Sequence, residues 1–66
     1  MNVNLYLMSY TREMKDDILY YKLRFFDTFN GLVFITYIHP KGIFEYIKNI
    51  DNGKKETIGA LKKEVA

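Results

Sequence analysis

The stretch Tyr20–Ile38 reads YYKLRFFDTFNGLVFITYI and carries the clearest structural signal in the chain. Two runs rich in aromatic and β-branched residues, which favour strands, flank the dipeptide Asn30-Gly31. Asn-Gly suits a two-residue type I′ turn, because both central positions of that turn need a positive φ. The stretch therefore predicts an antiparallel hairpin.

Two further turn signals follow Asn30-Gly31 at a constant interval. Pro40-Lys41-Gly42 and Asp51-Asn52-Gly53 each suit a type I turn that a left-handed glycine closes. Turns spaced by roughly 8–12 residues are typical of an antiparallel meander. The predicted fold class is mainly β: a five-stranded antiparallel meander, either an open sheet or a small barrel of the SH3 or OB kind. The predicted strands are Asn2–Tyr10, Asp17–Thr28, Leu32–His39, Ile43–Ile50 and Lys54–Leu61.

Two segments also fit a helix. Apolar residues recur at helical spacing over residues 11–29, with Thr11 as a candidate N-cap. This pattern gives an alternative α+β fold in which a helix over 11–29 lies on the sheet. Thr57–Val65 fits either the last strand or a short C-terminal helix, because Ile58, Leu61 and Val65 would share one helical face.

The predicted register divides the sheet into two faces. A two-residue turn places Phe29 opposite Leu32, and side chains alternate between the faces along each strand. One face is predicted to form the core from these apolar side chains: Leu19, Tyr21, Leu23, Phe25, Leu32, Phe34, Ile38, Phe44, Tyr46, Ile50 and Ile58.

The second face carries more apolar side chains than a sheet surface in water normally does. In the predicted register Phe26, Val33, Ile35 and Ile47 form a column on it. Exposed apolar patches of this kind mark interaction surfaces. We therefore expect the first strand, a C-terminal helix, a second subunit or a target protein to cover this face.

The length of 66 residues corresponds to one small domain, residues 1–66. A core of this size contributes about 3–5 kcal/mol, so small chains are often reinforced by disulfides, a metal or a partner. The chain has no cysteine and a single histidine, His39, which excludes disulfides and argues against a zinc site. Association with a partner is the reinforcement that remains.

No catalytic residue and no cofactor are predicted. The one adjacent acidic pair, Asp16-Asp17, would point to opposite faces of a strand, whereas acid–base catalysis needs groups that converge. His39 has no cysteine or serine partner at a recognisable spacing. The glycines are isolated turn residues and form no phosphate-cradling loop. We expect a protein that is not an enzyme and holds no metal.

The sequence also suggests where the protein works. The N-terminus lacks a basic segment, and no apolar run reaches the length that crosses a bilayer. We expect a cytoplasmic protein without a membrane partner. A composition rich in Lys, Asn, Ile and Tyr is typical of AT-rich genomes, such as those of many bacteria and their phages.

The leading hypothesis for function is a small non-enzymatic protein-interaction module. It would act as an inhibitor or regulator, of a kind that phages encode, that binds a larger protein and self-associates, as a dimer, through the apolar and aromatic sheet face. Aromatic and arginine side chains are the usual anchors of protein interfaces. The candidate partner-binding residues are Tyr20, Arg24, Phe26, Ile35 and Tyr37.

The alternative hypothesis is a small β protein that binds single-stranded nucleic acid. Aromatic side chains that stack on bases, next to cations that hold phosphates, are how small sheets bind single strands. A net charge of only +2 argues against it. Its candidate residues are Tyr20, Lys22, Arg24, Tyr37 and His39.

Overall fold

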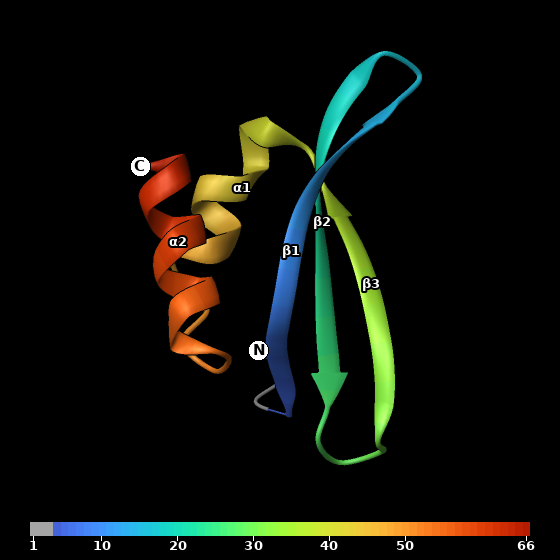
Figure 1. Ribbon diagram of the computed structural model, residues 1–66, viewed down its shortest axis with the longest axis vertical. Coiled ribbons are helices and arrows are strands. Elements are labelled where there is room, and N and C mark those ends of the chain that lie inside the picture. The colour runs from blue at the N-terminus through green and yellow to red at the C-terminus, as the bar shows by residue number, and fades with distance from the viewer. Residues whose placement is uncertain (1–3) are drawn as a thin grey trace.

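The computed structural model describes residues 4–66 and has an α+β fold, in which a three-stranded antiparallel sheet precedes two helices. The strands are consecutive in the sheet, in the order β1-β2-β3. Both helices lie on one face of this sheet (Figure 1). The elements are β1 (Leu5–Lys15), β2 (Ile18–Asp27), β3 (Leu32–Ile38), α1 (Pro40–Ile47) and α2 (Lys55–Val65).

The predicted five-stranded meander is wrong in its second half. The predicted strands Ile43–Ile50 and Lys54–Leu61 are replaced by α1 and α2. The alternative helix over 11–29 is also wrong, because that range holds the end of β1 and all of β2. Of the two interpretations of the C-terminal segment, the helical one is confirmed. The first two residues of the predicted strand Asn2–Tyr10 lie outside the described residues.

Helix α1 begins where a turn was predicted, because the residues around Pro40 stabilise a helix start. His39 is the N-cap, and its Nδ1 accepts a hydrogen bond from the backbone N–H of Lys41 at 3.1 Å. Pro40 follows at the first helical position, where its fixed φ suits a helix and its missing N–H costs nothing. Ile43 and Ile47, four residues apart, then lie buried on the same side of the helix.

The hairpin between β1 and β2 turns at Asp16 and Asp17, which both have positive φ, 53° and 65°. Two consecutive left-handed residues are the requirement of a type I′ turn, and aspartate tolerates that conformation better than most residues. β1 thus continues to Lys15 instead of ending at Tyr10 as predicted. The tip of this hairpin extends beyond β3 and the helices (Figure 1).

The hairpin between β2 and β3 has a four-residue loop instead of the predicted two-residue turn. Asp27 pairs with Leu32, and residues 28–31 form the loop. The Oδ1 atom of Asp27 accepts hydrogen bonds from the N–H groups of Phe29 (2.8 Å) and Asn30 (3.2 Å). Gly31 supplies the positive φ, 73°. The true register differs from the predicted one by two residues, which leaves every side chain on its predicted face.

Replacing Asp27 tests this loop. Asp27 is buried and also accepts a hydrogen bond from the Asn30 side chain at 3.2 Å. Asp27→Ala leaves the backbone N–H groups of Phe29 and Asn30 and the side-chain amide of Asn30 without their acceptor. We therefore expect the free energy of unfolding to fall by about 1–3 kcal/mol. Asp27→Asn keeps one acceptor oxygen and should lose less. Urea unfolding measures both, and an unchanged stability for Asp27→Ala would contradict the assigned role.

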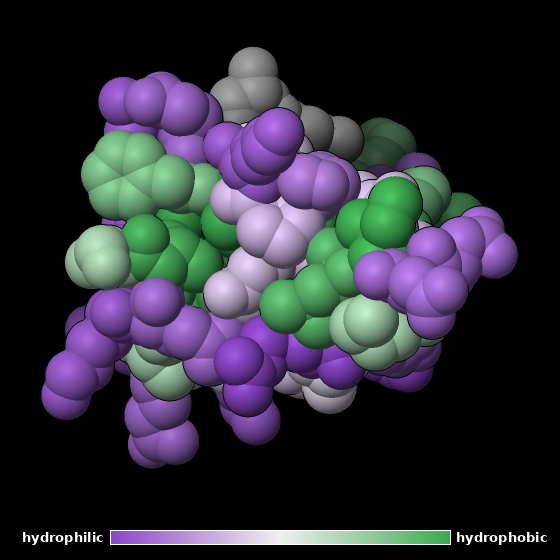
Figure 2. Space-filling model, turned by 90° about the horizontal axis from the view of Figure 1, so that it is seen from above, coloured by the Kyte–Doolittle hydropathy of each residue, from purple (hydrophilic) through white to green (hydrophobic). Residues whose placement is uncertain are grey.

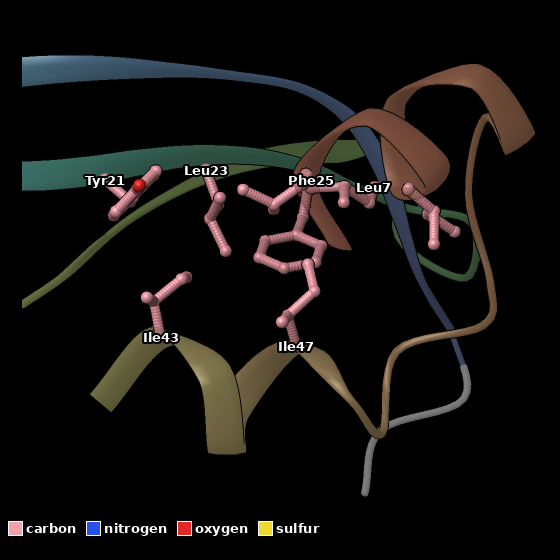
Figure 3. Close-up of a cluster of buried hydrophobic side chains, with 8 residues drawn as sticks. Leu7, Tyr21, Leu23, Phe25, Ile43 and Ile47 are labelled. Carbon is pink, nitrogen blue, oxygen red and sulfur yellow. The ribbon is translucent and has the colours of Figure 1, made fainter. Parts of the chain in front are cut away.

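The core lies between the sheet and the two helices (Figure 3). Ile43 and Ile47 point from α1 toward the side chains of β2 (Figure 3). The predicted core residues Tyr21, Leu23 and Phe25 are buried, whereas Phe44 and Tyr46 are exposed because they lie on other sides of α1. Among the described residues, the buried apolar side chains are Leu7, Tyr21, Leu23, Phe25, Ile43, Ile47, Ile58 and Leu61.

Tyr21 makes the stability of this core depend on pH. Burial raises the pKa of the Tyr21 hydroxyl above its ordinary value of 10.0, and the neighbouring Glu64 raises this pKa further. In the unfolded chain the group ionises near 10. Stability is therefore fully present below pH 10 and falls as the pH rises from about 10 toward the folded pKa.

Tyr21→Phe removes the group that titrates, so the fall in stability above about pH 10 should become shallower. Tyr46→Phe is a second test, since burial also raises the pKa of Tyr46, and this variant should likewise make the fall shallower. Urea unfolding at a series of pH values measures the slopes. An equal slope for the wild-type chain and Tyr21→Phe would contradict the prediction.

Within residues 4–66, neither helix combines the length and the apolar character that crossing a bilayer requires.

Candidate functional site

The sheet has one face that the helices cover and one that they leave open. Leu7, Leu23 and Phe25 are buried on the covered side. Side chains alternate along a strand, so the residues between them project from the opposite side. We call this opposite side the helix-free face, and no element of the described chain packs on it. It carries Phe26, Val33 and Ile35 of the predicted second face, whereas Ile47, which was predicted to join them, is buried in the core on α1.

The register arranges the helix-free face in rows that run across the three strands. One row holds Tyr6, Phe26 and Val33. The next holds Ser9, Arg24 and Ile35, and a third holds Thr11, Lys22 and Tyr37. Tyr20 follows opposite Glu13. All five candidate partner-binding residues therefore lie on one face, with Arg24 beside Ile35 in its middle row.

The residues of this face differ in exposure. Val33, Ile35 and Tyr37 on β3 remain 49%, 40% and 40% exposed, which is high for apolar residues in a strand. Arg24 is exposed, whereas Tyr20 and Phe26 are half-buried. The surface seen from above carries hydrophobic patches bordered by charged and polar side chains (Figure 2). The exposed apolar area is thus greatest along β3.

Tyr6 also lies on the helix-free face, although it is not among the predicted site residues, because β1 contains a bulge. The register shifts between Leu7 and Ser9, so Met8 has no opposite residue on β2. A bulge reverses the alternation of the faces beyond it. Tyr6 therefore lies on the helix-free face, while Tyr10 lies on the helix side, where its ring contacts that of Tyr21 at 6.4 Å between centroids. No residue in the sequence marks the position of this bulge.

Several polar groups of the face have partners within the chain. Lys22 Nζ lies 3.1 Å from a carboxylate oxygen of Glu13. Lys15 Nζ lies 4.2 Å from the ring centre of Tyr37, a cation–π contact. The rings of Tyr20 and His39 meet edge to face at 5.8 Å. These contacts hold the aromatic side chains in place and leave Arg24 as the central exposed cation of the face.

The residues considered for catalysis are dispersed. Asp16 and Asp17 occupy the exposed tip of the first hairpin. His39 caps α1 through its Nδ1 atom. In the described part of the chain no group of three or more His, Asp or Glu side chains could hold a metal ion.

A shallow groove lies between the two helices. Phe44, Ile47, Lys48, Lys62 and Val65 line it, and its volume is about 150 Å³. Small-molecule pockets usually measure about 300–1,000 Å³. The groove is too small to enclose a typical ligand, so the helix-free face is the stronger candidate for a functional surface.

No protein-family model, curated protein or solved structure matches this chain, so the candidate site is defined by its own geometry alone.

Proposed function

We propose that this chain is a small non-enzymatic protein-interaction module that binds a larger protein through its helix-free face and inhibits or regulates it. The observation that carries the proposal is the uncovered, aromatic sheet face with Arg24 at its centre. The proposal includes self-association, because the exposed apolar surface is large for so small a chain. It also includes a cytoplasmic location, which the absence of cysteine fits.

The composition of the face fits a protein partner. Interfaces between proteins rely on a few anchors, mostly Trp, Tyr and Arg, near the centre of the contact. Arg24 and Ile35 occupy the middle row, and Tyr37 and Phe26 lie in the rows on either side of it. The ion pair of Lys22 with Glu13 adds a polar border. A central arginine among aromatic and aliphatic side chains, with an ion pair beside them, is typical of protein interfaces.

Affinity capture from cells with the intact chain as bait identifies the partner, with nuclease treatment to remove nucleic acid. The captured protein is then purified and its Kd measured by calorimetry. We expect Arg24→Ala and Tyr37→Ala each to weaken binding by at least about tenfold, as hot-spot truncations do.

Matched controls come from the same residue types outside the face. Arg12 lies on the helix side of the sheet and is exposed, and Tyr46 lies on α1. Arg12→Ala and Tyr46→Ala should leave the Kd unchanged. Equal losses for the face variants and the controls would overturn the helix-free face as the binding surface.

Single-stranded nucleic acid is the second candidate ligand, favoured by the cation–π pair of Lys15 and Tyr37 on the same face as Arg24. Base stacking next to cations is the chemistry of single-strand binding. The pairing of Lys22 with Glu13 lowers the positive charge available to phosphates. Fluorescence anisotropy with labelled oligonucleotides at low salt tests it. Salt-sensitive binding that Tyr37→Ala abolishes would support this candidate, and no binding would exclude it.

A further inference from the structure

The outer edge of β3 has no partner strand in the described part of the chain. β3 pairs only with β2. The N–H of Thr28 donates to the carbonyl of Asn4, so the backbone groups of Thr28 point toward β1. The backbone groups of successive residues in a strand point alternately to its two sides. The β2 residues whose backbone groups point toward β3 are therefore Asp27, Phe25, Leu23 and Tyr21. The β3 residues opposite them, which use their own backbone groups to pair with β2, are Leu32, Phe34, Thr36 and Ile38. Val33, Ile35 and Tyr37 therefore direct their N–H and C=O groups outward.

The other edge of the sheet is protected. The N–H and C=O groups of Leu7 on β1 bond to Asn52 and Lys54 of the segment between the helices. β1 also contains a bulge and carries Arg12, Glu13 and Lys15. Charges, bulges and covering segments are the usual means by which proteins block an edge strand. β3 has none of them: it has no charged residue, no proline and no bulge.

Side chains on both sides of β3 are exposed. On the helix side Leu32 is 55% and Phe34 43% exposed, and on the helix-free side Val33 is 49% exposed. Both helices pack near β1 and β2, and of β3 only Ile38 at its end packs against the core (Figure 1). A partner lying on one face would cover only one of these sets. A strand added at the edge covers part of both.

We infer that the edge of β3 pairs with β3 of a second copy of this chain, antiparallel and centred on Ile35, to form a continuous six-stranded sheet. The inference rests on the self-association within the proposed function and assigns it to this edge. In this register Ile35 lies opposite Ile35 of the second copy and Val33 opposite its Tyr37. The seven residues of Leu32–Ile38 pair completely, because Ile35 is the middle one. Their outward backbone groups form hydrogen bonds across a two-fold axis.

The charge distribution permits a second copy to occupy this edge. Two copies that each carry +2 repel one another, and the uncharged β3 is where they can approach closely. The nearest central cations, the two Arg24 residues, would be separated by three strand spacings, roughly 14 Å. This distance exceeds the screening length of about 8–10 Å in ordinary buffer. In the paired dimer the helix-free faces of the two copies lie on the same side and form one continuous surface.

Sedimentation equilibrium of the whole chain from about 10 μM to 1 mM, combined with amide hydrogen exchange by NMR, tests the pairing. We expect a monomer–dimer equilibrium in which the amides of Val33, Ile35 and Tyr37 exchange at least about tenfold more slowly at high concentration. Ile35→Pro removes an outward donor, which an edge strand tolerates, and should raise the dimer Kd at least about tenfold. Arg12→Pro makes the same change at the β1 edge and should leave the dimer intact.

A monomer over the whole range overturns the inference. So does a dimer in which these three amides exchange freely and which Phe26→Glu dissociates, because that dimer uses the face. If Ile35→Pro does not fold, the amide hydrogen exchange of the wild-type chain at low and high concentration still distinguishes pairing at the edge from pairing through the face. A monomer that still binds its protein partner through Arg24 and Tyr37 removes this inference and the self-association, and it keeps the proposed target binding. An edge-paired dimer that binds no partner removes the proposed target and keeps the inference.

Discussion

Gly53→Ala lowers the free energy of unfolding by about 2–4 kcal/mol, from overpacking together with lost backbone hydrogen bonds. A Cβ atom at Gly53 would lie 2.6 Å from the carbonyl oxygen of Leu7 and 2.8 Å from its Cβ. Both contacts are closer than real Cβ atoms approach, and neither neighbour can move as a flexible side chain would. A loss of this size approaches the whole stability of about 3–5 kcal/mol that the core of so small a domain supplies.

The close approach at Gly53 exists because the segment between the helices pairs with β1. Gly53 and Leu7 form a parallel bridge. The N–H of Leu7 donates to the carbonyl of Asn52 at 3.0 Å, and the N–H of Lys54 donates to the carbonyl of Leu7 at 2.9 Å. The amide of Asn52 also donates to the carbonyl of Leu5 at 3.0 Å. Moving the segment to make room for a methyl group breaks these bonds and shifts the start of α2.

Gly59→Ala is the matched control, since it makes the same change inside α2 with no atom near the added methyl group. Alanine favours a helix over glycine, so Gly59→Ala should raise stability by about 0.5–1 kcal/mol. Urea unfolding followed by circular dichroism compares the two variants. A Gly53→Ala chain as stable as the wild type would mean that the segment does not lie against Leu7.

We expect Leu61→Ala to lower the free energy of unfolding by about 2–5 kcal/mol, because it opens a cavity in the core. Leu61 on α2 is fully buried and belongs to the cluster that joins the helices to β1 and β2. Ile58 and Leu61 are the two buried residues of α2, so their packing is what holds this helix on the sheet. We expect Leu61→Ala to leave α2 largely detached.

Leu32→Ala is the matched control, because it removes the same atoms from a side chain that is 55% exposed. Its cost should stay below about 1 kcal/mol when measured at a concentration where the chain is monomeric. Thermal and urea unfolding give both values. The two variants also separate the α+β fold from a five-stranded sheet, since Leu32 was predicted to lie in the core of that sheet. Equal losses would contradict the observed helix layer.

The evenly spaced glycines illustrate why the turn pattern misled the prediction. Only Gly31, Gly42 and Gly53 share the interval, and they serve three different purposes. Gly31 supplies a positive φ, Gly42 lies within the first turn of α1, and Gly53 allows contact between two backbones. Turn propensity is local and does not distinguish these uses. The segment after His39 therefore looked like a hairpin although it begins a helix.

The choice between strand and helix over residues 43–50 could not be made from spacing. Ile43 and Ile47 are four residues apart, a spacing that places them on one side of a strand as well as of a helix. The cap at His39 favours the helix locally. The decisive contribution is tertiary, because Ile43 and Ile47 bury themselves against Tyr21, Leu23 and Phe25 only when α1 crosses the sheet.

The sequence alone determined the hairpin of β2 and β3 and the two faces of its strands, including the shared face of Tyr20, Arg24, Phe26, Ile35 and Tyr37. Alternation is a local property, and it survived an error of two residues in the register. Only the tertiary structure decided that the helices cover one face, that a bulge at Met8 directs Tyr6 to the other, and that β3 keeps an open edge. These features depend on which surfaces the folded chain can bury together, and burial joins residues that are far apart in the sequence.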